Sequence, residues 1–310
     1  MFLVTGGAGF IGSHTAAALI AQGLRVRVLD DLCSGSLANL VGLDVEFHEG
    51  SVADSDAVGR AMQGCTEVVH LAALPSVPGS CRDPVAYDLV NVHGAVVVFE
   101  AARRAGVRRV VYASSSAVYG ASELLPKRED QSIDAQSPYA AAKAANEIYA
   151  ATFSRTLGLE CVGLRYFNVF GPRQDPNGPY AAVIPRFVEM ALGGTPLPIF
   201  GDGEQGRDFV SVHDVARANL LAARVPGLGG RVYNIGGGRM MSVNQLAHHV
   251  STVVGGVSVA HQPERPGDVR YSMADISRAT NELGWRPEAD FDAAMAETIR
   301  WYRERLAIPP

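Results

Sequence analysis

What the sequence lacks excludes several large classes of protein. No apolar run reaches the roughly 18 residues that a membrane-spanning helix needs, so we expect no membrane contact. The first residues form a short apolar segment without a basic stretch, and we expect no signal peptide. The net charge is −5 and there is no block of basic residues, so nothing indicates a nucleic-acid partner.

Cysteine is scarce, and its placement does not suggest a metal site. The 4 cysteines are scattered, with no CxxC pair and no Cys/His spacing of the kind that binds metal. We therefore expect no metal, reduced thiols and a cytoplasmic protein. The remaining composition, 47% hydrophobic and 19% charged, is that of an ordinary globular protein. A length of 310 residues predicts one large domain or two closely packed domains.

The most informative stretch lies near the middle of the chain, where 137–143 reads SPYAAAK. Tyr139 and Lys143 are spaced to share one face of a helix, and Pro138 suits the first helical turn. A lysine cation close to a tyrosine favours the phenolate and lowers the tyrosine pKa. Such a tyrosine can act as a base near neutral pH. The pair proves little alone, because any helix can carry it.

The start of the chain has the pattern of a dinucleotide-binding βαβ unit. A short apolar strand at 2–5 runs into Gly6, Gly9 and Gly12, and a helical pattern follows as far as Gly23. Glycines in this arrangement allow a tight turn, close approach of the backbone to pyrophosphate, and close packing of helix on sheet. The N–H groups at the start of the helix can then bind phosphate.

A carboxylate at the end of the second predicted strand indicates which dinucleotide binds. The strand at 25–29 ends at Asp30 and Asp31, about 20 residues beyond the glycines, where an acid binds a ribose 2′-hydroxyl. NADP would need a basic residue for its 2′-phosphate, and none follows immediately. We therefore predict NAD, with Asp30 favoured over Asp31 as the ribose ligand.

Strands and helices continue to alternate, which predicts an α/β fold with a doubly wound parallel Rossmann sheet. Further strands are expected at 45–50, 68–73 and 107–112, and helices at 91–105, 139–158, 180–192, 242–254, 275–284 and 290–305.

Loop signals become frequent from residue 171. We expect an NAD-binding Rossmann domain at 1–170, to which the chain returns at about 206–236. The smaller, mixed α/β C-terminal substrate domain would span 171–310, interleaved with the first.

Motifs in a recognisable order cover nearly the whole chain. They are TGGAGFIG at 5–12, HLAA at 70–73, Asn91, YASSSAVYG at 112–120, YAAAK at 139–143, LRYFNVFGPRQ at 164–174, GDGEQGRDFVSVHD at 201–214 and RPGD at 265–268. With these motifs the sequence resembles the extended short-chain dehydrogenase/reductase superfamily, and within it the NAD-dependent UDP-hexose 4-epimerases. The stretches 165–178 and 180–185 look most like those of UDP-N-acetylglucosamine 4-epimerases.

The resemblance implies a set of residues that bind NAD. They are Gly6, Gly9, Phe10, Ile11, Gly12, Asp30, Asp31, Ser34, Gly35, Ser51, Val52, Leu71, Ala72, Ala73, Asn91, Ser114, Tyr139, Lys143, Tyr166, Asn168 and Val169. Ser51 departs from the family, in which an aspartate commonly reaches the adenine amino group. This puts the adenine contact in question, but not the cofactor.

The resemblance also implies a catalytic set of Ser115, Tyr139 and Lys143, with Ser116 as the alternative to Ser115. In similar 4,6-dehydratases an Asp-Glu pair follows the catalytic hydroxyl, and the related UDP-glucuronate decarboxylases carry a glutamate there. This chain has Ser116 and Ala117 instead. Without an acid, neither reaction has its proton donor or base, which weighs against both.

The implied substrate is a UDP-sugar. Its pyrophosphate would lie at Arg207 and Arg265, because the arginine fork matches phosphate oxygens, and its uridine ribose at Asp268. In the family a small residue in the place of Ser272 admits N-acetyl sugars. UDP-N-acetylglucosamine is therefore expected as a substrate, with or without UDP-glucose. The implied substrate-binding residues are Ser115, Ser116, Tyr139, Asn168, Val183, Arg207, Arg265, Asp268 and Ser272, with Arg173 and Arg186 as auxiliaries.

The implied activity is inversion at sugar carbon 4 through a transient 4-keto sugar, in a homodimer that pairs the helices near 91–105 and 139–158. An epimerase or reductase acting on UDP-glucuronate or on a CDP- or dTDP-hexose is the alternative within enzymes. A regulatory protein that binds NAD is the alternative outside enzymes. The two histidines in cofactor motifs, His14 and His70, are expected to be structural.

Overall fold

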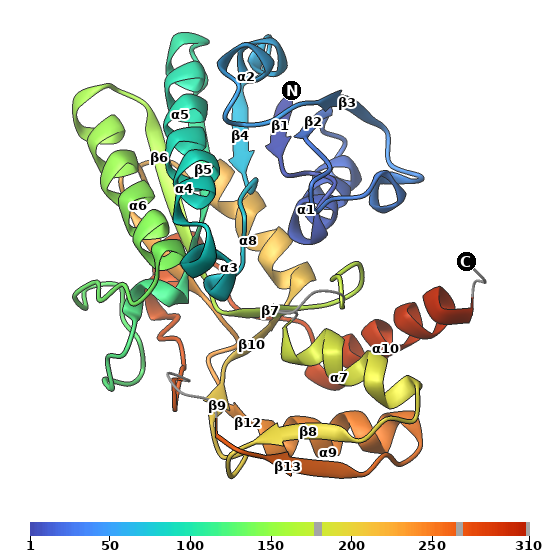
Figure 1. The fold of residues 1–310 in the computed structure, drawn as a ribbon. Helices are drawn as coiled ribbons and strands as arrows, with labels where there is room; N and C mark the ends of the chain where they lie inside the picture. Colours follow the sequence, from blue (N-terminus) through green and yellow to red (C-terminus); the bar gives the residue numbers. More distant parts are fainter. Residues whose placement is uncertain (177–181, 265–268, 308–310) are drawn as a thin grey trace.

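The chain forms two lobes, a larger one built on a parallel sheet and a smaller one below it in Figure 1. The computed structural model describes residues 1–176, 182–264 and 269–307. Arg265 and Asp268 lie outside the described residues.

Seven parallel strands form the sheet of the larger lobe, in the order β11-β6-β5-β4-β1-β2-β3. The strands are β1 (Phe2–Thr5), β2 (Val26–Asp30), β3 (Val45–Glu49), β4 (Glu67–His70), β5 (Arg109–Ser115), β6 (Glu160–Tyr166) and β11 (Val232–Ile235). The order reverses between β1 and β4, as in doubly wound sheets. This confirms the predicted Rossmann class.

Helices cover both faces of this sheet (Figure 1). They are α1 (Phe10–Ala21), α2 (Ser55–Met62), α3 (Val77–Arg82), α4 (Pro84–Asp88), α5 (Gly94–Arg104), α6 (Pro138–Thr156) and α8 (Val212–Arg224), with short 3-10 or π-helical turns η1 (Leu37–Leu40), η2 (Leu89–His93) and η3 (Ser116–Tyr119). The helix expected at 91–105 therefore begins within a π-helical turn.

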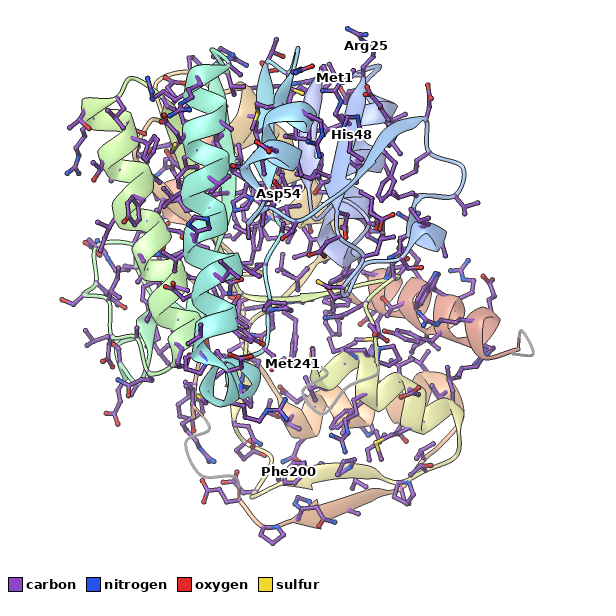
Figure 2. All side chains as sticks on the ribbon, turned by 45° about the horizontal axis from the view of Figure 1, so that its top comes forward. Met1, Arg25, His48, Asp54, Phe200 and Met241 are labelled. Carbon is purple, nitrogen blue, oxygen red and sulfur yellow. The ribbon has the colours of Figure 1, made fainter. Side chains whose placement is uncertain are left out.

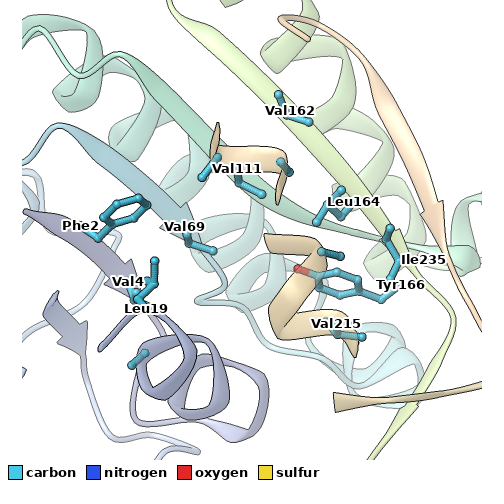
Figure 3. Packing of buried hydrophobic residues seen from close by; sticks show 14 of the residues in the cluster. Phe2, Val4, Leu19, Val69, Val111, Val162, Leu164, Tyr166, Val215 and Ile235 are labelled. Carbon is cyan, nitrogen blue, oxygen red and sulfur yellow. The ribbon is translucent and has the colours of Figure 1, made fainter. Parts of the chain in front are cut away.

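Alternation of side chains along the strands divides the core into two layers. In β1, Val4 packs on the α1 and α8 side, and in β5 Val111 does the same, as Figure 3 shows. Their neighbours Leu3 and Val110 point the other way, into a second cluster with residues of α2, α5 and α6. Runs of apolar residues in the sequence thus correspond to strands buried on both faces.

The smaller lobe has its own core, to which Phe187, Leu246 and Met295 contribute. Its elements are α7 (Val183–Leu192), β8 (Leu197–Phe200), β9 (Gly206–Arg207), β12 (Met241–Ser242), α9 (Val243–Val254), β13 (Val259–Gln262) and α10 (Phe291–Ala307). Two further strands pair between the lobes, β7 (Asn168–Phe170) and β10 (Phe209–Ser211), and the π-helical turn η4 (Ala279–Leu283) occupies the place of the helix expected at 275–284.

The carboxyl ends of the sheet strands face the smaller lobe. Met1 and Arg25 directly precede β1 and β2, and they lie at the end of the molecule away from Phe200 and Met241 of the smaller lobe (Figure 2). Ligands of doubly wound folds bind beyond the carboxyl ends of the strands. The site is therefore expected between the two lobes.

One long apolar helical stretch among the described residues packs partly into the core. It runs from Pro84 to Arg104 through α4, η2 and α5, and with a mean hydropathy of 1.3 it is long and apolar enough to cross a membrane by length and composition alone. Its residues Val98 and Phe99 are fully buried in the α2, α5 and α6 layer. Packing within the fold thus accounts for part of its apolar character, since 39% of the stretch is buried.

His70 joins the ends of two central strands. Its Nδ1 lies 2.7 Å from the Thr5 hydroxyl at the end of β1. Burial lowers the pKa of His70 to about 3, and the nearby charge of Lys143 acts in the same direction. The imidazole is therefore neutral in the fold, consistent with a structural role.

Acid is expected to destabilise the protein through His70. The folded-state pKa lies below the ordinary value of 6.5, so the stabilisation is present above 6.5 and is lost as the pH falls toward 3. The shift corresponds to on the order of 5 kcal/mol. In urea unfolding across this range, the free energy should fall less steeply with acid for His70→Asn than for the wild type. His248→Asn, at an exposed position of α9, is the control, and equal slopes for all three proteins would contradict the prediction.

Candidate active site

The glycine loop is packed so closely that it leaves no room for side chains. Gly6 has φ +68°, and a Cβ there would lie 2.7 Å from the Ala72 nitrogen. A Cβ at Gly12 would lie 2.0 Å from the Gly6 oxygen. Helix α1 begins at Phe10, directly after Gly9, with no acidic residue in its first turn. This bare helix N-terminus fits a dinucleotide pyrophosphate.

Asp30 ends β2 beside this loop. Its carboxylate accepts hydrogen bonds from the backbone nitrogens of Ala8 and Leu32, both at 2.9 Å. Burial raises the pKa of Asp30, and these two hydrogen bonds act against the rise. Asp31 is exposed and accepts from the Cys33 nitrogen. Of the two carboxylates, Asp30 is therefore the one held against the glycine loop.

The loop that carries Asp30 also positions Gly35. A Cβ at Gly35 would lie 2.9 Å from Asp30 Oδ1, so this glycine packs directly on the carboxylate. The neighbouring Ser34 is exposed. At the end of β3, the Ser51 hydroxyl accepts a hydrogen bond from the Ala53 nitrogen, and Val52 is buried.

The residues after β4 follow the edge of the sheet. The nitrogens of Leu71 and Ala72 donate to the backbone oxygen and the hydroxyl of Thr5, and Ala73 continues the loop. Asn91 pairs with both backbone groups of Leu74, at 2.8 and 3.0 Å. Its buried amide thus holds this loop in place.

Two of the predicted cofactor residues turn their side chains away from the edge. Tyr166 is buried, and its hydroxyl donates to Asn219 of α8 at 2.7 Å. Ser114 is also buried, and its hydroxyl donates to Glu147 at 2.5 Å. Strand alternation decides both orientations. Ser114 and Tyr166 remain predicted NAD-binding residues, and in this structure their backbone is the part that faces the edge of the sheet.

Tyr139 and Lys143 lie in the first turns of α6. Ser137 caps the helix by accepting from the Ala140 nitrogen, and Pro138 follows in the first turn. The Tyr139 nitrogen donates to the buried Ser80 of α3 at 3.0 Å. Lys143 Nζ donates to the Ala113 oxygen of β5 at 2.9 Å. The helix therefore presents both side chains to the end of β5.

Burial dominates the pKa values of this pair. It raises the pKa of Tyr139, while a hydrogen bond with Ser115 acts in the opposite direction. It lowers the pKa of Lys143 to about 8. Nζ of Lys143 lies 5.8 Å from the Tyr139 ring centre. The pKa of Tyr139 is therefore raised in this structure, and not lowered as expected from the neighbouring Lys143, because the buried phenolate would lose its hydration.

The serines after β5 differ in their surroundings. The Ser115 hydroxyl lies close enough to Tyr139 to act against the rise in its pKa, and it accepts a hydrogen bond from the Ala117 nitrogen at 3.1 Å. Ser116 begins the turn η3 and is partly exposed. Of the two candidates for the catalytic hydroxyl, Ser115 is thus the one in contact with the tyrosine.

The predicted substrate residues meet around β9. Asn168 donates to the Asp208 oxygen at 3.1 Å, and the Ser272 nitrogen donates to the Gly206 oxygen at 3.1 Å. Arg207 lies between Gly206 and Asp208 in sequence and is half-buried. The structure thus brings Asn168, Arg207 and Ser272 together. Val183 starts α7, and Val169 pairs with Val210 of β10.

Arg173 and His14 lie elsewhere. Both line a cavity of about 630 Å³ together with His213 of α8 and Trp301 of α10. His14 Nε2 is 2.9 Å from the Pro172 oxygen, and burial lowers the His14 pKa to about 4. This supports a structural role for His14. The position of Arg173 does not support the suggested auxiliary role at the substrate phosphates. The position of Arg186 does not support that role either.

Several polar residues that hold the site were not predicted as site residues from the sequence. Ser80 reaches Tyr139 from a distant segment, and Asp208 accepts from the nitrogens of Gly237, Gly238 and Ala274. Burial raises the pKa of Asp208 to about 6. Asp208 lies within the 201–214 motif, and Glu147 lies one helical turn beyond Lys143 on the same face, so both had a signal in the sequence.

Gly12→Ala is expected to abolish NAD retention, because the added Cβ would overlap the Gly6 oxygen and force the loop apart. Gly59→Ala is the matched control, since a Cβ there has no neighbour within 4 Å. NAD released from each purified protein by denaturation would be measured. A wild-type content of NAD in Gly12→Ala would contradict the prediction.

Known proteins of similar sequence and structure fit this geometry. A family model described as "NAD dependent epimerase/dehydratase family" matches residues 2–236. The chain is 41% identical to the UDP-glucose 4-epimerase of Mycolicibacterium smegmatis, covering 98% of each. It is 36% identical to a dTDP-glucose 4,6-dehydratase of Streptomyces niveus, covering 98% of this chain and 93% of that protein. A solved structure of UDP-N-acetylglucosamine 4-epimerase from Methanobrevibacter ruminantium M1, in complex with UDP-N-acetylmuramic acid, has a TM-score of 0.94 at 40% identity and 98% coverage of each. The chain belongs to the NAD-dependent epimerase/dehydratase family.

Proposed function

We propose that the protein is an isomerase that inverts carbon 4 of a UDP-hexose. The observation that carries the proposal is the convergence of Ser115, Tyr139 and Lys143 at the carboxyl edge of the sheet. These groups suit proton transfer at a sugar hydroxyl beside a nicotinamide. The related 4-epimerases support this substrate class.

Each residue has a defined task in this reaction. Tyr139 removes the proton of the 4-hydroxyl, and Ser115 hydrogen-bonds the carbonyl that forms. Lys143 would hold the nicotinamide ribose. Bound NAD would supply the acceptor and donor of a hydride at sugar carbon 4, with a 4-keto sugar between the two transfers, and a positive charge that favours the Tyr139 phenolate. Arg207 and Arg265 would anchor the nucleotide while the sugar turns, with Asp268 at the uridine ribose.

Dehydration is disfavoured, although similar dehydratases exist. Water elimination needs an acid and a base beside the catalytic hydroxyl. The positions after Ser115 are Ser116 and Ala117, within the turn η3. Neither side chain can act as an acid. Epimerisation or reduction of UDP-glucuronate or of a CDP- or dTDP-hexose is the second candidate, and net consumption of NADH would identify a reductase.

Tyr139→Phe is expected to abolish turnover while the protein stays folded, because the ring packs as before but the base is gone. The assay incubates protein with UDP-N-acetylglucosamine or UDP-glucose, without added cofactor, and separates the products by chromatography. Tyr149→Phe, an exposed position of the same helix, should turn over like the wild type. Full activity of Tyr139→Phe would overturn the assignment. The ratio of the wild-type rates with the two substrates tests whether the small side chain of Ser272 admits N-acetyl sugars.

A homodimer formed through the α6 side of the larger lobe is part of the proposal. Exposed apolar side chains gather there, with Leu89 of η2 at 51% and Ile148 of α6 at 66% exposed. The two elements are in contact with each other. Exposed apolar side chains on adjoining elements are typical of interfaces.

The 4 cysteines are free thiols, which supports a cytoplasmic location.

Ile148→Asp is expected to convert the dimer into a monomer, because a charge would be buried at the interface. Light scattering at micromolar concentration measures the mass. Val253→Asp, at an exposed apolar position of α9 in the smaller lobe, should leave the mass unchanged. A wild-type protein that is monomeric would contradict the proposal.

A further inference from the structure

A buried carboxylate lies one helical turn beyond Lys143. The Glu147 side chain is 7% exposed, and its oxygens accept from Arg165 Nε at 2.9 Å and from Arg165 Nη2 at 2.7 Å. The Ser114 hydroxyl donates to the same carboxylate at 2.5 Å. Arg165 is 3% exposed. Burial alone would lower the pKa of Arg165, but the Glu147 carboxylate outweighs it and raises the pKa.

The two donors stand side by side on neighbouring strands. Ser114 of β5 is the register partner of Arg165 of β6. One carboxylate on α6 therefore binds the carboxyl ends of two strands. Ser115, which contacts Tyr139, is the next residue of β5. The helix that carries Tyr139 and Lys143 is thus tied directly to the strand that carries Ser115.

Arg165 extends the connection across the sheet. Its Nη1 donates to the Tyr119 hydroxyl at 2.8 Å, and that hydroxyl donates to Asn234 Oδ1 at 2.6 Å. Asn234 is the register partner of Arg165 on β11. Its amide nitrogen donates to the backbone oxygens of Lys127 and Asp275. The network thus reaches the segment that follows Ser272.

The stability of the fold does not explain why the charged pair Glu147 and Arg165 is buried here. Removing an arginine and a carboxylate from water has a desolvation cost that often exceeds their attraction, so well-packed apolar residues would serve stability as well. The pair does supply direction, because the planar guanidinium and the two carboxylate oxygens bond in one geometry. Directional bonds suit a device that sets distances between elements.

We propose that the Glu147–Arg165 pair is a positioning device that sets the end of β5, and with it Ser115, against Tyr139 and Lys143. The inference rests on the proposed function, since it assigns these groups to proton and hydride transfer. A displacement of reacting groups by about 1 Å can lower a rate by about 100-fold. Loss of the device should therefore lower kcat and spare substrate affinity.

A second arginine–glutamate pair, which joins β5 to β6, provides the control. Arg109 and Glu160 are register partners at the opposite ends of β5 and β6, away from the site. Arg109 is 1% exposed and Glu160 is 38% exposed, and Arg109 Nε donates to Glu160 at 2.9 Å. The comparison is Glu147→Gln on α6, whose carboxylate binds the carboxyl ends of β5 and β6, with Glu160→Gln at the amino end of β6.

The experiment measures kcat, KM and thermal stability of each variant with the UDP-sugar that the wild type turns over. Glu147→Gln should lower kcat by on the order of 10–100-fold with little change in KM. Glu160→Gln should lower only thermal stability. If Glu147→Gln does not fold, Ser114→Ala tests the same point, because it keeps the ion pair and removes only the bond to β5. Ser114→Ala should also lower kcat without raising KM.

The inference is overturned if Glu147→Gln, or Ser114→Ala in its place, keeps the wild-type kcat. It is also overturned if Glu160→Gln loses as much kcat as Glu147→Gln. Failure of the proposed function is a separate result, since it appears as absence of epimerisation by the wild type. If the wild type does not epimerise, a sugar nucleotide is added and the absorbance of reduced nicotinamide is followed. The rate at which this absorbance rises is then compared between the wild type and the variants.

Discussion

The site depends on the parallel register of the central strands. Because β1, β2, β4, β5 and β6 all run in one direction, their carboxyl ends meet at a single edge. The glycine loop, Asp30 and Ser115 therefore lie at this edge, although they are far apart in the chain. Asp208 and Asn168 then join the smaller lobe to the same edge through hydrogen bonds between their side chains and backbone groups.

Burial has opposite effects on the two central side chains of the site. It raises the pKa of Tyr139 and lowers the pKa of Lys143 to about 8, because neither charge is hydrated there. The fold alone therefore keeps the phenol protonated. A positive charge brought by the cofactor opposes this, so the base would be activated only in the complex in which it is needed. In the reaction that we propose, this would couple NAD binding to proton removal.

Much of the fold could be predicted because it is encoded by local spacing. The glycines and the Pro138 start of α6 follow from backbone sterics and helix periodicity, and the Rossmann class follows from alternating elements. Side-chain direction could not be predicted in the same way. Ser114 and Tyr166 belong to motifs, yet both turn into the core, because strand alternation and the position of α8 decide their orientation.

The sequence by itself determined the family, the NAD-type glycine loop and the spacing of Tyr139 and Lys143, since neighbours in the chain carry each of these. The tertiary structure decided which hydroxyl contacts Tyr139, how burial shifts the pKa values, and that Glu147 binds two strands at once. These properties depend on segments that are distant in sequence. Only folding brings their charges and hydrogen-bonding groups out of water and within reach of one another.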